Sequence, residues 1–134
     1  MRKTLTAILA AVLCVVFLAG CGDAGVSNTL LPDTRGIEHI FVSTMPQMHE
    51  GTLTGEKAVK LAEYILDMDV QAEFSEDPNV YTGMTWVLAV NYEDGSTVTV
   101  EFFGNLFIRA DAGSWQKVSQ QEAQGLEALL KELQ

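Results

Sequence analysis

Residues 84–103 read MTWVLAVNYEDGSTVTVEFF, and this stretch decides which fold the rest of the chain must complete. Large apolar side chains alternate with smaller or polar ones on both sides of residues 93–95, as in two antiparallel strands joined by a tight turn. A two-residue turn would put the apolar sets of the two strands on opposite faces, because a slip of one residue turns every side chain over. The pattern therefore predicts a three-residue turn with Gly95 as the left-handed bulge residue, and one apolar face made of Trp86, Leu88, Val90, Val98, Val100 and Phe102.

The next turn, at residues 104–105, has two readings. A two-residue turn would send Arg109 to the apolar face of the sheet. A looser turn pairs Phe102 with Ile108 and sets Arg109 across from Glu101 on the other face. Because an unpaired buried arginine costs several kcal/mol, the sequence predicts the looser turn.

Two further segments have the periodicity of amphipathic helices. Apolar side chains recur at helical spacing over residues 55–67, after Thr54, a favourable N-cap residue. Residues 119–122 form a capping-box sequence, Ser-Gln-Gln-Glu, ahead of a terminal helix. Gly125 lies inside that helix and costs it about 1 kcal/mol relative to alanine. The buried face of the terminal helix is marked by Leu126, Leu129 and Leu130.

Shorter segments complete the expected sheet. A first strand over residues 37–42 is followed by a loop over 44–51, and the remaining strands are expected within 70–74, 106–110 and 115–118. An antiparallel sheet with one apolar face needs cover on that face, which two amphipathic helices supply. We therefore predict an α+β fold: an antiparallel β-meander of about four to five strands with two amphipathic helices packed on one face.

The start of the chain has the features of an export signal. Arg2 and Lys3 precede an uncharged apolar run of about 14 residues, which is shorter than the roughly 20 that a membrane-spanning helix needs. The run ends in Leu-Ala-Gly-Cys at residues 18–21, which resembles the lipobox of bacterial lipoproteins, where a diacylglyceryl group is attached to the cysteine before cleavage. That resemblance implies a lipid anchor on Cys21 and a protein held at the extracytoplasmic face of the cell membrane.

The same resemblance divides the chain into three parts. Residues 1–20 are expected to be the lipoprotein signal peptide, residues 21–36 the lipidated N-terminus with a flexible tether, and residues 37–134 a single α+β domain. Leu30 and Leu31 leave open whether part of the tether docks on the domain.

Charge limits the range of partners. After removal of residues 1–20, six basic residues stand against 18 acidic ones, a net charge of −12. Nucleic acids and anionic lipid head groups are bound through basic patches, so this balance argues against both as partners. No cysteine follows Cys21, so the exported part has no intramolecular disulfide and depends on its hydrophobic core.

The exported part also resembles the small lipoprotein domains of unknown function that are common in Gram-positive bacteria. The resemblance is a pattern of turns and aromatic residues that runs into the capped helix, and it implies no activity. Its residues are Trp86 to Tyr92, Asp94-Gly95-Ser96, Phe103-Gly104-Asn105 and Gly113-x-Trp115.

One group of side chains is a candidate binding surface. In the predicted registers it lies on the face of the sheet that points away from the helices, where two phenylalanines accompany a charge pair. Such exposed apolar patches tend to mark contacts. The alternative is that the tether or residues 69–79 fold over these rings and bury them. The candidate surface consists of Thr85, Val87, Glu101, Phe103, Phe107 and Arg109.

Other candidate chemistry is sparse. Met45, Met48 and His49 would suit Cu(I), although a loop whose methionines cover the edge of the core explains the same residues. The acidic segment 67–77 lacks the ligand spacing of an EF-hand loop, and a solvated acidic face accounts for it. The sequence contains no nucleophile elbow, phosphate loop or metalloprotease motif. It therefore predicts no enzyme and no cofactor.

Three classes of function follow from these observations. The leading one is a membrane-anchored extracytoplasmic lipoprotein that acts as an interaction or ligand-binding module, with an envelope protein or a small ligand as its partner. The second is an accessory or inhibitory subunit of an envelope enzyme or transporter. The third is a copper-handling protein that uses Met45, Met48 and His49.

Overall fold

The computed structural model describes residues 28–134, and the predicted signal peptide and Cys21 lie outside the described residues. Within residues 28–134 the chain forms one antiparallel sheet of seven strands in the order β2-β1-β4-β5-β6-β7-β3, together with two long helices. The α+β class is confirmed, whereas the predicted number of four to five strands is too low. The elements are β1 (Ile37–Met45), β2 (Glu50–Leu53), α2 (Gly55–Asp67), β3 (Val70–Gln71), the 3₁₀ turn η1 (Pro78–Val80), β4 (Thr85–Tyr92), β5 (Thr97–Phe103), β6 (Phe107–Ala110), β7 (Gln116–Val118) and α3 (Gln120–Leu133).

The central hairpin has the predicted register. Its loop has three residues: the amide of Tyr92 donates to the carbonyl oxygen of Ser96 over 2.9 Å, and Gly95 has a φ of +88°. Leu88 and Val100 are paired and fully buried, as the alternating pattern requires. The looser second turn is also confirmed, because the β5–β6 pairing sets Phe102 against Ile108 and Glu101 against Arg109.

Strands β1 and β2 extend into both ends of the loop predicted over residues 44–51, and residues 46–49 remain as the turn between them. This turn is stabilised by Thr44, a buried residue whose hydroxyl accepts hydrogen bonds from the amides of Met48 (2.8 Å) and His49 (3.0 Å). Only Leu53 of the four residues in β2 is buried, so the strand carries no alternating pattern by which it could be recognised. At the opposite edge, β3 has only two residues and pairs with β7.

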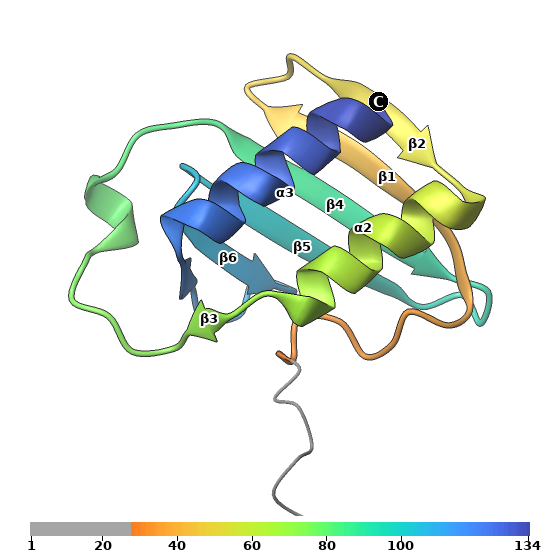
Figure 1. The fold of residues 1–134 in the computed structure, drawn as a ribbon, viewed down its shortest axis with the longest axis horizontal. Coiled ribbons are helices and arrows are strands. Elements are labelled where there is room, and N and C mark those ends of the chain that lie inside the picture. Colours follow the sequence, from red (N-terminus) through yellow and green to blue (C-terminus); the bar gives the residue numbers. More distant parts are fainter. Residues whose placement is uncertain (1–27) are drawn as a thin grey trace, which may run out of the picture.

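Both helices lie across the same face of the sheet (Figure 1). Helix α2 has the predicted bounds, and α3 begins after Ser119, whose hydroxyl accepts a hydrogen bond from the amide of Glu122. Buried helical residues such as Leu61 and Leu126 belong to one core with the inward residues of the strands. We call the opposite face of the sheet the outer face.

Residues 28–36, predicted to be part of a flexible tether, pack against the domain instead. Leu30 and Leu31 are 4% and 3% exposed and belong to the core. The side-chain amide of Asn28 donates to two backbone carbonyls at the C-terminal end of α2, those of Ile65 (2.6 Å) and Met68 (2.9 Å). Of the alternatives that the sequence left open for Leu30 and Leu31, docking on the domain is the one that the structure shows.

Gly125 is required by a contact between the helices. The hydroxyl of Tyr64 on α2 donates to the backbone oxygen of Glu122 over 3.0 Å, and a Cβ at position 125 would overlap that hydroxyl. Helix propensity alone favours alanine by about 1 kcal/mol. We nevertheless expect Gly125→Ala to lower the free energy of unfolding by about 1–3 kcal/mol, because the tyrosine ring must move and lose its hydrogen bond.

Denaturant titration measures this change. In a Tyr64→Phe background the same substitution should cost less, since the overlapping hydroxyl is gone. A gain in stability from Gly125→Ala in the otherwise unchanged protein would mean that the Tyr64 side chain turns away at little cost and that this contact does not require glycine.

Candidate functional site

The six residues of the predicted binding surface all lie on the outer face. Strand pairing places them in two adjacent rows that cross β4, β5 and β6. One row consists of Thr85, Phe103 and Phe107, and the other of Val87, Glu101 and Arg109. The register of the central hairpin therefore brings them together as expected, but their accessibility differs.

Phe107 is fully buried, so it is not part of an accessible surface. Residues 72–83 cross the outer face and bring two rings onto it: Phe74 lies 5.4 Å from the Phe107 ring, centroid to centroid, and Tyr81 lies 5.3 Å away in an edge-on arrangement. The Phe103 ring also stacks on the Phe107 ring, with 6.4 Å between their centroids. The sequence left open whether these rings form an exposed binding surface or are covered by another segment. For Phe107 the structure shows the second, burial under the acidic segment.

Two adjacent acidic residues of the covering segment, Glu76 and Asp77, make polar contacts. Lys117 on β7 forms an ion pair with Glu76, and its ammonium group lowers the pKa of that carboxyl group. Asp77 caps η1 by accepting a hydrogen bond from the amide of Asn79 over 3.0 Å. These contacts place η1 and Tyr81 as a wall along the outer face.

A groove of about 380 Å³ remains open between this wall and the sheet. It includes four of the six predicted residues, whereas Val87 lies outside its lining. We call it the outer groove; its lining consists of Pro78, Asn79, Tyr81, Thr85, Glu101, Phe103, Arg109 and Trp115.

An ion pair supplies the charged groups of the outer groove. The Nε atom of Arg109 donates to Oε2 of Glu101 over 2.6 Å, and the two side chains are only 26% and 19% exposed. The guanidinium carbon of Arg109 lies 4.3 Å from the centre of the Trp115 ring, a cation–π distance. Because both charges are mostly withdrawn from water and fixed by neighbours, the pair is a pre-arranged set of hydrogen-bonding groups.

Sequence reasoning missed the walls of the groove. Trp115 directly precedes β7 and lies two residues before Lys117, which pairs with Phe107 on the outer face, so the strand period alone could have indicated its direction. Tyr81 lies in an irregular segment between η1 and β4, where no periodicity relates it to the sheet. Only the path of residues 72–83 places it there.

The structure does not bring the three predicted copper ligands together. Met45 pairs with Thr85 and so projects from the outer face, whereas the His49 ring stacks on Trp86, a core residue, at 5.6 Å between centroids. Met48 is 69% exposed in the turn. Among residues 28–134, no group of three or more histidine, cysteine, aspartate or glutamate side chains is arranged to hold a metal ion, the acidic segment 67–77 included.

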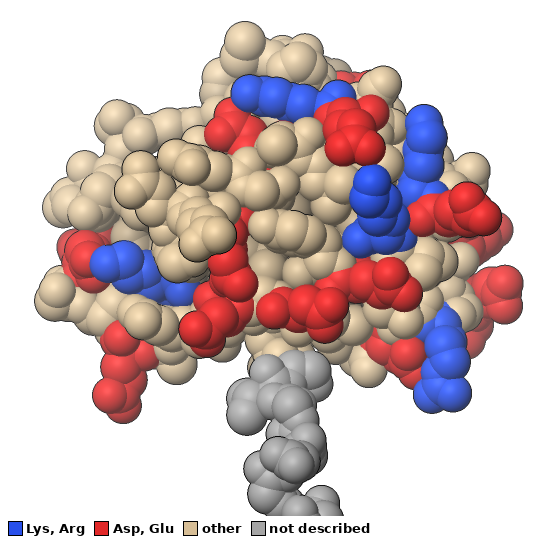
Figure 2. All heavy atoms as spheres, in the orientation of Figure 1, with Lys and Arg blue, Asp and Glu red and all other residues tan. Residues whose placement is uncertain are grey.

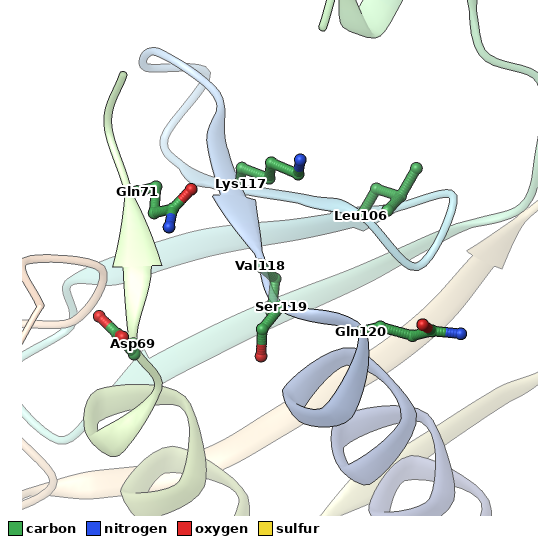
Figure 3. Close-up of a pocket in the computed structure, with 7 residues that line it drawn as sticks. All are labelled: Asp69, Gln71, Leu106, Lys117, Val118, Ser119 and Gln120. Carbon is green, nitrogen blue, oxygen red and sulfur yellow. The ribbon is translucent and has the colours of Figure 1, made fainter. Parts of the chain in front are cut away.

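A second cavity, of about 330 Å³, lies between β3, β7 and the start of α3 (Figure 3). Figure 3 shows its polar side chains pointing in different directions. Two of them already have structural partners, because Lys117 pairs with Glu76 and Ser119 caps α3. This cavity therefore lacks the convergent groups of the outer groove.

The helix side of the molecule presents dispersed charge. Figure 2 shows acidic side chains spread over this face with lysine and arginine side chains between them. Ion pairs on the helices, such as Lys60 with Glu132 at 3.2 Å, are largely exposed. Exposed pairs contribute little to stability. The charges on this face are therefore those of a solvated surface and do not form a binding site.

Comparisons with known proteins add no assignment. No protein-family model matches the chain, and no curated protein or solved structure is significantly similar to it. Within residues 28–134, neither helix combines the length and the apolar content needed to cross a membrane.

Proposed function

We propose that the protein is a lipid-anchored binding module at the extracytoplasmic face of the cell membrane, and that the outer groove is its ligand site. The observation that carries the binding part is the convergence in one groove of an ion pair, two neutral polar side chains and three aromatic rings. Small-molecule sites typically have volumes of about 300–1,000 Å³ and combine apolar walls with a few placed polar groups. The outer groove, at about 380 Å³, suits a small ligand or one unit of a longer one.

Binding explains this arrangement better than catalysis. Each charged group in the groove has a partner: Glu101 holds Arg109, and Arg109 lies over Trp115. A general acid or base must exchange protons with a substrate, and a nucleophile needs an adjacent base. A carboxylate committed to an arginine is instead suited to accept hydrogen bonds and to orient a ligand.

The anchoring part of the proposal rests on the resemblance of residues 18–21 to a lipobox. The distance between such an anchor and the domain is limited by Asn28, because the Asn28 side chain is hydrogen-bonded to the C-terminal end of α2. Seven residue steps separate Cys21 from Asn28, which span roughly 25 Å when fully extended. A lipid on Cys21 would therefore hold the domain close to the membrane surface rather than at the end of a long tether.

Fluorescence of Trp115 tests the binding part. Replacing the buried Trp86 by phenylalanine leaves Trp115, in the groove wall, as the only tryptophan. We expect the emission of the full-length protein, in a non-ionic detergent without a sugar head group, to change on titration with a bacterial cell-envelope extract. Tyr81→Ser should abolish the change, because it removes the exposed ring of the groove.

Phe41→Ser is the matched control for this experiment. Phe41 on β1 and Tyr81 are both 37% exposed, but Phe41 lies outside the groove lining. The control should therefore keep the fluorescence response. A response that both substitutions abolish equally, or no response to the extract, would contradict a ligand site in the outer groove.

A further inference from the structure

We infer, on the basis of the proposed function, that the outer groove binds a neutral sugar ring, such as one unit of an uncharged envelope polysaccharide. The inference concerns the chemical class of the ligand. It rests on three features of the groove: the balance of its charges, its hydrogen-bonding groups and its aromatic walls.

The charge balance disfavours an ionic ligand. Glu101 and Arg109 neutralise each other within the groove at 2.6 Å, and both are largely buried. A ligand carboxylate would have to compete with Glu101 for the guanidinium group, and a ligand cation would have to displace Arg109 from both Glu101 and Trp115. Breaking a largely buried pair is costly because it leaves one charge without its partner. A neutral ligand leaves the pair intact.

The hydrogen-bonding groups fit hydroxyl groups. Within residues 28–134 only Nε of Arg109 is hydrogen-bonded, so the terminal N–H groups of this ion pair remain available as donors and the second carboxylate oxygen of Glu101 as an acceptor. Asn79 and Thr85 add neutral polar groups to the same lining. Each hydroxyl of a sugar both donates and accepts a hydrogen bond, so adjacent hydroxyls match a donor and an acceptor that lie side by side.

The aromatic walls fit the apolar face of a sugar ring. Tyr81 presents a ring that is 37% exposed, and Phe103 and Trp115 line the same groove with their centroids 6.0 Å apart. The C–H groups of a pyranose gather on one face of the ring, while its hydroxyls lie around the rim. A groove lined by aromatic rings and by a paired arginine and glutamate contacts both parts of such a ligand at once.

The experiment divides the envelope extract by chemistry and follows Trp115 emission in the Trp86→Phe protein. Protease digestion should leave the response unchanged, whereas periodate, which cleaves vicinal diols, should abolish it. The response should appear in the fraction that passes through an anion-exchange column. Raising the salt concentration from about 50 to about 500 mM should change the apparent affinity less than twofold, because a neutral ligand has no charge to screen. Tyr81→Ser should weaken binding of this fraction at least tenfold, and Phe41→Ser less than twofold.

Each contrary outcome has its own meaning. Loss of the response on protease digestion but not on periodate treatment would overturn the sugar assignment and leave the proposed groove function standing. A response confined to the anion-exchange-retained fraction would overturn the neutral class in the same way. If untreated extract produces no response that depends on Tyr81, both the sugar assignment and the proposed function fail.

Discussion

Phe102→Ala is expected to lower the free energy of unfolding by about 3–5 kcal/mol, the usual cost of truncating a buried phenylalanine. Phe102 is fully buried and lies between Trp86 on β4 and Ile108 on β6, in the inner face of the central strands. The total stability of a small domain is about 5–15 kcal/mol. This one change therefore removes a large part of it, and urea or guanidinium titration measures the loss.

Val87→Ala is the matched control. Val87 follows Trp86 on β4, but its side chain points to the outer face and is only half-buried. Its truncation should cost roughly 1 kcal/mol or less, because few contacts are lost. Equal sensitivity at positions 87 and 102 would mean that the strands of the central hairpin are paired one residue out of register.

Cys21→Ser is expected to release the protein from the membrane fraction and to stop incorporation of labelled fatty acid. The diacylglyceryl group is joined through a thioether, which a serine hydroxyl does not form. Each buried methylene of an acyl chain contributes about 0.8 kcal/mol, and two chains give stable anchoring where one gives only marginal binding.

Cys14→Ser supplies the control, because Cys14 lies in the apolar run of the predicted signal peptide and is not the lipobox cysteine. This variant should still be lipidated and membrane-bound. If Cys21→Ser remains in the membrane fraction with its label, the lipoprotein assignment is wrong, whatever the outcome of the groove experiments.

A binding site on the outer face has a consequence for stability. The groove wall at Tyr81 also covers Phe107, which is fully buried outside the main core. Any substitution that loosens residues 72–83 changes the site and the outer aromatic cluster together. Thermal unfolding of each groove variant therefore has to accompany its binding measurement, and a variant with a preserved melting temperature reports on the ligand contact alone.

The parts of the fold that depend on local pattern were predictable. Alternation over residues 84–103 encodes which side chains share a face, and the three-residue turn at Gly95 is the solution that joins both apolar sets. The same reasoning placed Arg109 opposite Glu101, because the alternative buried an arginine. The bounds of α2 also followed from its period.

Other features depend on which distant segment covers a surface. Leu30 and Leu31 lie in a polar segment without periodicity, yet the core accepts them beside α2. Gly125 looks unfavourable within its own helix and becomes necessary only when Tyr64 approaches from the other helix. β2 has a single buried residue, so its pairing with β1 leaves little trace in the sequence.

The candidate site depends both on local sequence pattern and on contacts between distant segments. The sequence by itself determined that Thr85, Glu101, Phe103 and Arg109 share a face, because side-chain direction along a strand has a period of two and is fixed by neighbouring residues. Tertiary structure alone decided that residues 72–83 cross this face, bury Phe107 and raise a wall at Tyr81. An irregular segment has no period to reveal which surface it will cover. Its position results from long-range contacts, such as the one between Glu76 and Lys117, which form only when the whole sheet is assembled.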